Sequence, residues 1–185
     1  MSKKKFGIRE VVAIGIGTAL FIVLSYVSIP FGFIPNTSVQ VRMALLAFFS
    51  AIYGPVVGGA VGFLGHALAD AIQYGSVWWS WVFPDAVFGV IVGLLAAKYL
   101  IEEGGFKGKQ ILLFNVMQVI GNAIAWVVIA PILDILIYAE PSNKVFVQGL
   151  TSFISNAITV GVIGTLLAFA YTKVKAGSSS LSKED

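Results

Sequence analysis

Residues 110–131 read QILLFNVMQVIGNAIAWVVIAP, a run without a single Asp, Glu, Lys or Arg. Three further stretches, 11–41, 43–69 and 145–172, are equally free of these residues. Each is long enough for the roughly 20 apolar residues that cross a bilayer core. The whole chain is 58% hydrophobic and 11% charged, whereas soluble domains carry about 25% charged residues. The sequence therefore excludes an ordinary soluble domain and predicts an integral membrane protein.

Two breaks bring the number of expected helices to six. A single helix over residues 39–73 would be about 52 Å long, against about 30 Å for the hydrocarbon core, and Tyr53-Gly54-Pro55 supplies an interruption. Pro84 suits the first turn of another helix, where no amide hydrogen is needed. We expect an all-α, six-transmembrane-helix bundle over residues 1–173, followed by a flexible cytoplasmic tail over 174–185. The expected spans are 9–28, 39–53, 55–73, 82–101, 110–131 and 146–173.

The distribution of basic residues predicts the orientation. Cytoplasmic segments of membrane proteins carry an excess of Lys and Arg. The apolar run after the Lys-rich start is longer than the roughly 7–15 residues of a signal-peptide core, so we expect residues 3–28 to remain as the first helix. With both termini cytoplasmic, ten of the twelve Lys and Arg residues lie on the inner side. These ten are Lys3, Lys4, Lys5, Arg9, Lys98, Lys107, Lys109, Lys173, Lys175 and Lys183.

Several classes of chemistry are excluded by composition and motif. The chain has no cysteine, which excludes disulfides, thiolate metal sites and cysteine nucleophiles. The net charge of +3 indicates membrane orientation rather than nucleic-acid binding. A phosphate-binding loop needs a first Gly, four residues, then Gly-Lys and Ser or Thr, but Gly108-Lys109 is preceded by Glu103 and followed by Gln110. We expect this chain to hydrolyse no ATP, so ions or another protein must supply transport energy.

Four ionisable residues of the expected helices gather in the outer leaflet. Arg42 falls near the outer end of the second helix, His66 and Asp70 in the outer half of the third, and Asp85 at the outer start of the fourth. Ionisable side chains inside a membrane are costly and mark functional sites by default. His66 and Asp70 are four residues apart and can hydrogen-bond on one helix face, which also suits a pair that only stabilises the bundle. All four are candidate substrate-binding residues.

The last two expected helices carry polar residues at helical spacing. Gln118 and Asn122 are four residues apart, and Gln148, Ser152 and Asn156 follow one another at steps of four. Such stripes either line a cavity or form interhelical hydrogen bonds, which contribute about 0.6 kcal/mol each. Both interpretations stay open, and we include all five residues among the substrate-binding candidates.

Two outer loops complete the predicted pocket. Trp78, Trp79 and Trp81 lie together between the third and fourth helices; tryptophan is typical of the membrane interface, yet the rings of Trp78 and Trp79 could also stack on a flat ligand. The loop over residues 29–38 contains two prolines, a glycine and no charge, which is typical of a stiff apolar lid rather than a hydrated connector.

These features predict a pocket open to the outside that binds a small polar-aromatic molecule. Arg42 is suited to an anionic or carbonyl group of the ligand. Asp70 or Asp85 is suited to accept hydrogen bonds from ring amines or hydroxyls.

The first expected helix carries two interleaved pairs of small residues. Ala13 pairs with Gly17 and Gly15 with Ala19, and such spacing lets a second helix approach backbone to backbone. The second helix belongs either to a partner protein or to the same chain, and both alternatives stay open. Gly58, Gly59, Gly62 and Gly65 of the third helix repeat the pattern, and we interpret them as internal packing.

The chain resembles the S components of energy-coupling factor (ECF) transporters, the substrate-binding membrane subunits of bacterial vitamin importers. It is most similar to the branch described as riboflavin-transporter-like or hydroxymethylpyrimidine-transporter-like. The resemblance covers nearly the whole chain. The segments that carry it are AIGIGTAL at 13–20, VQVR at 39–42, YGPVVGG at 53–59, HALAD at 66–70 and FPD at 83–85.

The resemblance implies a six-helix subunit of the bacterial cell membrane that captures a vitamin from outside. It implies docking on a membrane scaffold subunit coupled to two ATP-binding-cassette ATPases, so ATP is used by the partners and no cofactor or metal is bound by this chain. The family's docking signature, Ala-xxx-Ala on the first helix, falls on Ala13 and Gly17, with Gly15 and Ala19 beside them. The resemblance also implies that the loaded subunit topples in the membrane to carry its pocket inward. Hydroxymethylpyrimidine, pyridoxine-like and riboflavin-like compounds all remain candidate substrates.

Two alternatives belong to other functional classes. His66, Asp70 and Asp85 could serve as relay groups of an autonomous proton-coupled carrier, because histidine titrates near neutral pH. A membrane-embedded hydrolase would need an activated serine, but Ser50, Ser152 and Ser155 lie outside any Gly-x-Ser-x-Gly motif. We therefore expect no enzymatic activity.

Overall fold

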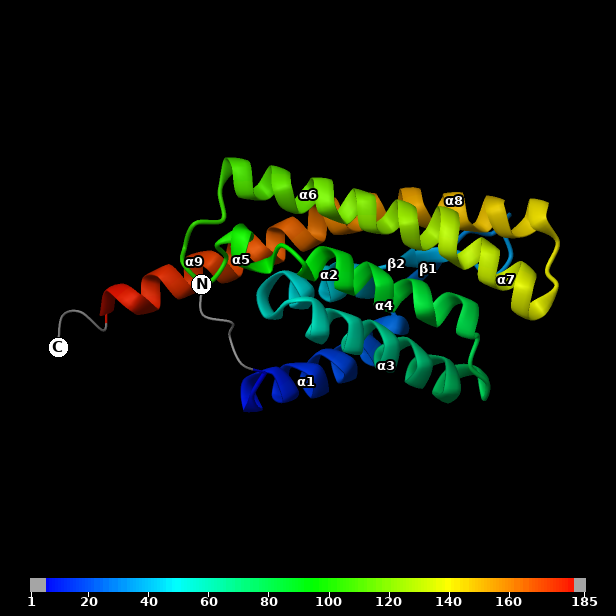
Figure 1. The fold of residues 1–185 in the computed structure, drawn as a ribbon, viewed down its shortest axis with the longest axis horizontal. Helices are drawn as coiled ribbons and strands as arrows, with labels where there is room; N and C mark the ends of the chain where they lie inside the picture. The colour runs from blue at the N-terminus through cyan, green and yellow to red at the C-terminus, as the bar shows by residue number, and fades with distance from the viewer. Residues whose placement is uncertain (1–5, 182–185) are drawn as a thin grey trace.

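The computed structural model of the protein describes residues 6–181, with side chains described as far as Ala176 (Figure 1). Long helices dominate it, with one short antiparallel hairpin near the N-terminus. In chain order the elements are α1 (Ile8–Ser25), β1 (Ser28–Pro30), β2 (Ser38–Gln40), α2 (Arg42–Tyr53), α3 (Pro55–Tyr74), α4 (Trp79–Gly93), α5 (Ala96–Tyr99), α6 (Gly108–Asn122), the π-helix η1 (Ala123–Ile129), α7 (Ala130–Tyr138), α8 (Ser142–Thr159), the π-helix η2 (Val160–Gly164) and α9 (Thr165–Leu181).

Four of the described helical segments are long and apolar enough to cross a membrane: Ile8–Ser25, Pro55–Tyr74, Gly108–Tyr138 and Ser142–Ala176. The apolar helices α2 and α4 are shorter, with 12 and 15 residues. At 1.5 Å per residue they reach about 18 and 22 Å, less than the core of about 30 Å. An all-α membrane protein is therefore supported, whereas the count of six spans and the cytoplasmic termini remain predictions.

Several expected boundaries were wrong, each for a local reason. The helix expected over 82–101 ends at Gly93 and resumes as α5; the hydroxyl of Tyr99 donates to the carbonyl of Val92, 2.8 Å away, which the end of α4 leaves without a helical partner. The start of the helix expected over 39–53 is instead strand β2, which pairs with β1. The helix expected over 110–131 continues to Tyr138, because Pro131 lies in the first turn of α7, directly after the π-helical stretch.

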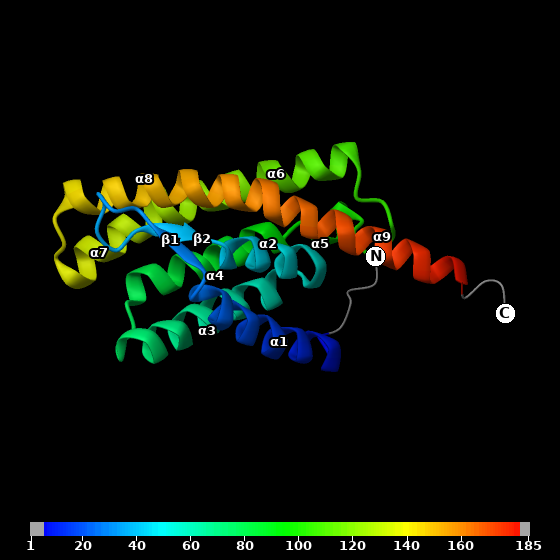
Figure 2. The same cartoon turned by 180° about the vertical axis from the view of Figure 1, so that it is seen from behind.

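Helix α2 lies at the centre of the bundle. It packs against α1, α3 and α4 on one side and against η2, α8 and α9 on the other, and its side chains Met43, Leu46 and Ala47 are fully buried. Figures 1 and 2 show α1, α3 and α4 together on one side, with α6 and the α8–α9 rod running along the other. The predicted helical bundle is thus organised around a short, buried second helix.

Helices α3 and α4 touch backbone to backbone through glycines. A Cβ atom at Gly58 would lie 2.5 Å from the carbonyl oxygen of Gly89, and one at Gly62 would lie 2.5 Å from the carbonyl oxygen of Asp85. Gly59 and Gly65 also face this chain's own side chains. The interpretation of these glycines as internal packing is confirmed. The close approach holds Asp85 against the turn of α3 that follows Gly62.

The two ends of the bundle differ in character. One end carries the hairpin, the α3–α4 connection, α7 and the start of α8, and the other carries the starts of α1 and α6, together with α5 and α9 (Figure 1). At this second end Arg9 pairs with Glu102, Nη1 to Oε2 at 3.3 Å.

The expected flexible tail over 174–185 is helical as far as the structure describes it, because helix α9 extends to Leu181. Residues 182–185 lie outside the described residues, as do the basic residues Lys3, Lys4, Lys5 and Lys183.

Candidate functional site

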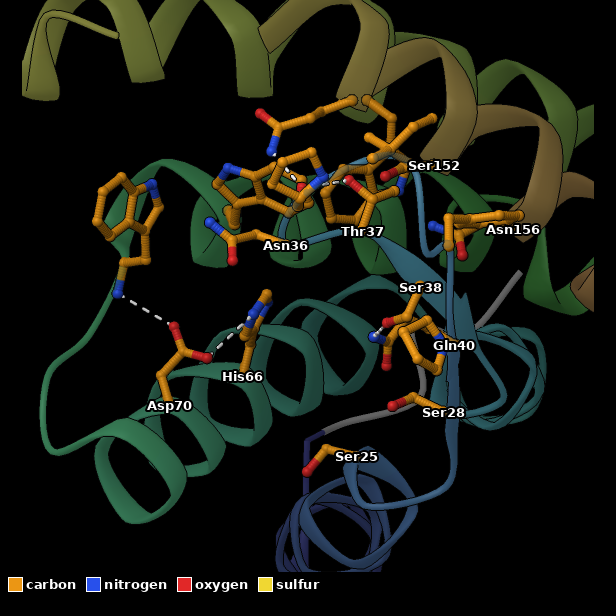
Figure 3. A pocket seen from close by; sticks show the side chains of 18 of the residues that line it. Ser25, Ser28, Asn36, Thr37, Ser38, Gln40, His66, Asp70, Ser152 and Asn156 are labelled. Carbon is orange, nitrogen blue, oxygen red and sulfur yellow. Dashed lines mark hydrogen bonds and ion pairs between the residues drawn. The ribbon is translucent and has the colours of Figure 1, made fainter. Parts of the chain in front are cut away.

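A cavity of about 750 Å³ lies at the hairpin end of the bundle. Figure 3 shows its walls: α3 carries His66 and Asp70 on one side, α8 carries Ser152 and Asn156 on the other, and the hairpin with Ser38 and Gln40 lies between them. Polar side chains from α1, β1, β2, α2, α3, α7 and α8 line it. Of the predicted site residues, Arg42, His66, Asp70, Trp78, Gln148, Ser152 and Asn156 line this cavity.

His66 is the centre of a buried charged cluster. Its Nδ1 lies 2.7 Å from Oδ2 of Asp85, and its Nε2 lies 3.4 Å from Oδ1 of Asp70 and 3.4 Å from Nη2 of Arg42. The structure thus brings together the four ionisable residues that the sequence placed in one leaflet, on α2, α3 and α4. Nε2 can accept from Arg42 in the neutral ring or donate to Asp70 in the charged ring. Asp85 itself lies behind His66 and is fully buried.

Arg42 is a buried cation at the start of α2. Only 9% of the residue is exposed, and its guanidinium lies over the ring of Phe21 at 4.9 Å. It makes no ion pair with a carboxylate of the described residues, and its Nε has no hydrogen-bond partner there. Arg42 is therefore available to an anionic or carbonyl group in the cavity.

Asp134 belongs to the site and was not predicted. It lies on α7, is 2% exposed, and lines the cavity. The indole nitrogens of Trp78 and Trp81 each donate to it at 2.7 Å, and the hydroxyl of Ser80 donates as well. It was missed because the expected helix ended at 131. The available signal was its isolation as the single charge within the apolar stretch 124–138.

The tryptophans divide between two environments. Trp78 and Trp81 line the cavity, as does Trp126 of η1; Trp78 stacks on Tyr138 with ring centroids 4.2 Å apart, and Trp81 packs against Trp126 at 5.4 Å. Trp79 does not line the cavity: its ring stacks on Phe63, 5.9 Å away. The backbone amide of Trp78 donates to Asp70 at 3.0 Å, which ties the α3–α4 connection to the charged cluster.

The polar stripes behave differently on the two helices. Gln148, Ser152 and Asn156 of α8 face the cavity, where Oδ1 of Asn156 has no partner among the described residues. Gln118 and Asn122 of α6 do not line it. Instead, Gln118 donates to the carbonyl of Ala157 across the helix interface, and Asn122 donates to Gln118. Gln118 therefore has the interhelical role that was the alternative interpretation, whereas Asn122 bonds within its own helix.

The loop expected to act as a lid forms the hairpin and its turn. Phe31, Pro35 and Thr37 of this segment line the cavity. Nε2 of Gln148 donates to the carbonyl of Pro35 at 2.8 Å, and β2 packs against α8 (Figure 2). The hairpin is thus held across the cavity by α8.

The small residues of α1 point to two different sides. Ala13 and Gly17 are buried, and a Cβ atom at Gly17 would lie 2.8 Å from Val61 and 2.9 Å from Phe49. Gly15 and Ala19 are exposed, and nothing lies within 4 Å of a Cβ atom at Gly15. The pair Ala13–Gly17 is therefore occupied by this chain's own helices, and the pair Gly15–Ala19 is open.

Comparison with known proteins gives a consistent result. The family model described as "ECF-type riboflavin transporter, S component" matches residues 5–173. The chain is 52% identical to a UPF0397 protein of Streptococcus gordonii, over 97% of this chain and 96% of that protein. It is 52% identical to a UPF0397 protein of an Exiguobacterium species, over 97% and 98%, and 49% identical to one of Clostridium perfringens, over the full length of both.

Proposed function

The chain belongs to the family of ECF-type riboflavin transporter S components, and from this membership we propose that it captures a small water-soluble vitamin or vitamin precursor from outside the cell. S components are the substrate-binding membrane subunits of ECF transporters. The observation that carries the proposal is the cavity described above, which places three tryptophans and a buried arginine at one end of an apolar bundle; this arginine has no ion-pair partner among the described residues. A flat, hydrogen-bonding molecule suits such walls.

The cavity residues have distinct roles in this proposal. Arg42 binds an anionic or carbonyl group, because its guanidinium is buried without a carboxylate partner. Ser152 and Asn156 supply a hydroxyl and an amide to the polar edge of the ligand. The rings of Trp78 and Trp81 stack on its flat face. Hydroxymethylpyrimidine, pyridoxine-like and riboflavin-like compounds all have this combination of a flat ring and polar edges.

Partner subunits supply the energy. We propose that the chain joins a membrane scaffold subunit and two ATP-binding-cassette ATPases, and that it catalyses no reaction itself. The open pair Gly15–Ala19 is the proposed contact with the scaffold, because its small side chains leave room for a second helix.

The test of this function is uptake into sealed vesicles. The chain is reconstituted with and without the scaffold and ATPases, and small molecules retained from a vitamin mixture are identified by mass spectrometry. We expect accumulation only with all partners and ATP. The second candidate, a proton-coupled carrier, is favoured by the position of His66 between Asp70 and Asp85; uptake by the chain alone, driven by a pH gradient, would support it and contradict the ECF proposal.

Docking is tested separately by enlarging the open pair. We expect Ala19→Leu to abolish co-purification with the scaffold while leaving ligand binding intact, because Ala19 is exposed on α1 and does not line the cavity. Ala170→Leu makes the same change on the exposed face of α9 and should leave assembly unchanged. Equal co-purification of both variants with the wild type would remove this docking surface.

A further inference from the structure

One acidic side chain in the cavity wall has no basic partner among the described residues. The charged side chains that line the cavity are two basic and three acidic: Arg42, Lys144, Asp70, Asp134 and Glu140. Lys144 pairs with Glu140 at 2.7 Å, and Asp70 lies beside His66 at 3.4 Å. Asp134 makes no ion pair with any Lys, Arg or His within residues 6–176. A negative charge therefore remains at the α7 side of the cavity.

Three hydrogen-bond donors converge on the carboxyl group of Asp134. Indole nitrogens can only donate, and those of Trp78 and Trp81 are directed at Oδ1 and Oδ2 respectively. Each carboxyl oxygen of Asp134 therefore accepts at least one hydrogen bond. The three donors satisfy the geometry of the carboxylate but bring no positive charge. Burying an ion without a counter-ion costs several kcal/mol.

Aromatic rings surround this carboxylate. Trp78 and Trp81 point their N–H edges at Asp134, Tyr138 covers one side of Trp78, and Trp126 packs on Trp81. The faces of aromatic rings attract cations, most strongly when water is excluded. A carboxylate held within a group of tryptophans is therefore a place for an organic cation, where ring faces and the carboxylate act together.

We propose that the substrate carries a positively charged nitrogen, such as a quaternary ammonium or an N-alkylated heteroaromatic ring, and that this group binds against Trp78 and Trp81 beside Asp134. The inference rests on the proposed function and narrows it, because it assigns to the same cavity a vitamin or precursor with a positively charged nitrogen rather than the uncharged hydroxymethylpyrimidine and riboflavin types. Arg42 lies elsewhere on the cavity wall, and a chain of contacts joins it to Asp134. Arg42 contacts His66, and His66 contacts Asp70. The backbone amide of Trp78 donates to Asp70, and the indole of Trp78 donates to Asp134. A ligand that also carries an anionic or carbonyl group can therefore engage both charges.

The experiment compares two probes of nearly equal size on the purified full chain in detergent. 1-Methylnicotinamide is a ring cation, and N-methylnicotinamide carries the same methyl group on its amide and is neutral. Bound probe is measured by equilibrium dialysis at neutral pH. We expect the cation to bind about tenfold more tightly or better, in line with a desolvated cation–aromatic interaction. Equal affinities, or no retention of the cation at millimolar concentration, would overturn the inference.

Two variants locate the effect. Asp134→Asn should remove the preference for the cation while changing the affinity for the neutral probe less than twofold. Glu140→Gln removes one negative charge from the same cavity wall, but at a side chain already paired with Lys144, and should preserve the preference. A preference that survives Asp134→Asn, or is lost equally in both variants, would contradict the assignment. Co-purification with the scaffold, measured on the same samples, reports on the proposed function independently.

Discussion

Arg42 and Asp134 differ from the other buried charges of the cavity because neither has a partner of opposite sign within ion-pair distance among the described residues. His66, Asp70 and Asp85 form contacts with one another and stabilise the junction of α3 and α4. Replacing His66, Asp70 or Asp85 leaves a remaining buried charged side chain without its ion-pair partner, which strongly destabilises the folded protein. Removing Arg42 leaves no such orphaned ion-pair partner, so its contribution to binding can be separated from its contribution to stability.

Arg42→Gln should weaken binding of the retained small molecule about tenfold to a hundredfold, because a hydrogen bond to a charged group contributes about 1.5–3 kcal/mol. The measurement is equilibrium dialysis together with a thermal unfolding curve in detergent. Lys144→Gln is the control, since Lys144 lines the same cavity but is paired with Glu140. If both substitutions reduce affinity equally, a general loss of positive charge explains the result and Arg42 has no specific role.

The residues of the charged cluster were predictable because each is rare in an apolar helix. The i to i+4 spacing of His66 and Asp70 placed them on one face, and positive-inside counting put Arg42 and Asp85 at the same level. Asp134 was missed because the expected helix ended at residue 131, whereas the helical stretch continues to Tyr138. The positions of Trp79, Gln118 and Asn122 relative to the cavity depend on helix rotation, which residue types do not reveal.

At the level of elements, the α3–α4 contact determines the position of the cluster. Gly58, Gly62 and Gly89 let two helices approach until backbone touches backbone, and this brings Asp85 within 2.7 Å of His66. A larger residue at the contact would separate the helices. The positions of the cavity residues on α3 and of the tryptophans near the start of α4 therefore depend on small residues that do not line the cavity.

Gly62→Ala should lower the free energy of unfolding by about 1–3 kcal/mol, the usual cost of overpacking, because its Cβ atom would lie 2.5 Å from the carbonyl oxygen of Asp85. Gly15→Ala is a matched control within a helix, with nothing within 4 Å of the new atom, and should be neutral or slightly stabilising. Denaturation of both variants in detergent gives the comparison. A Gly62→Ala variant as stable as Gly15→Ala would show that the contact is not tight.

The helical character and the order of the long apolar helices were predictable, because apolar runs without charge indicate membrane helices. Their ends were less predictable. The hairpin has only three residues in each strand and too little pattern to be recognised, and the π-helical stretch let the chain pass Pro131 where an ordinary helix would kink or stop. Both deviations border the cavity, where irregular backbone often accompanies function.

At the level of the whole molecule, the two ends have unequal charge. The described segments with most basic residues, the start of α1, α5, the start of α6 and α9, lie at the end remote from the cavity (Figure 1). Positive-inside orientation therefore predicts that the cavity opens away from the cytoplasm. This geometry is what an importer's capturing subunit requires.

Single cysteines can test this orientation, since the chain has none of its own. We expect a membrane-impermeant maleimide to label Asn143→Cys on intact cells, because Asn143 is exposed at the start of α8 near the cavity. Lys107→Cys, exposed at the opposite end, should be labelled only after the cells are permeabilised. The reverse labelling pattern would mean that the cavity faces the cytoplasm and that the positive-inside rule does not hold for this chain.

The gathering of Trp78, Trp81 and Trp126 around the cavity, which holds three of the chain's four tryptophans, has a practical benefit. The protein's ultraviolet emission originates mostly from the walls that a guest molecule would touch. Occupancy can therefore be followed optically, without a dye and without knowing the guest in advance, so that compound libraries can be screened on the unmodified chain.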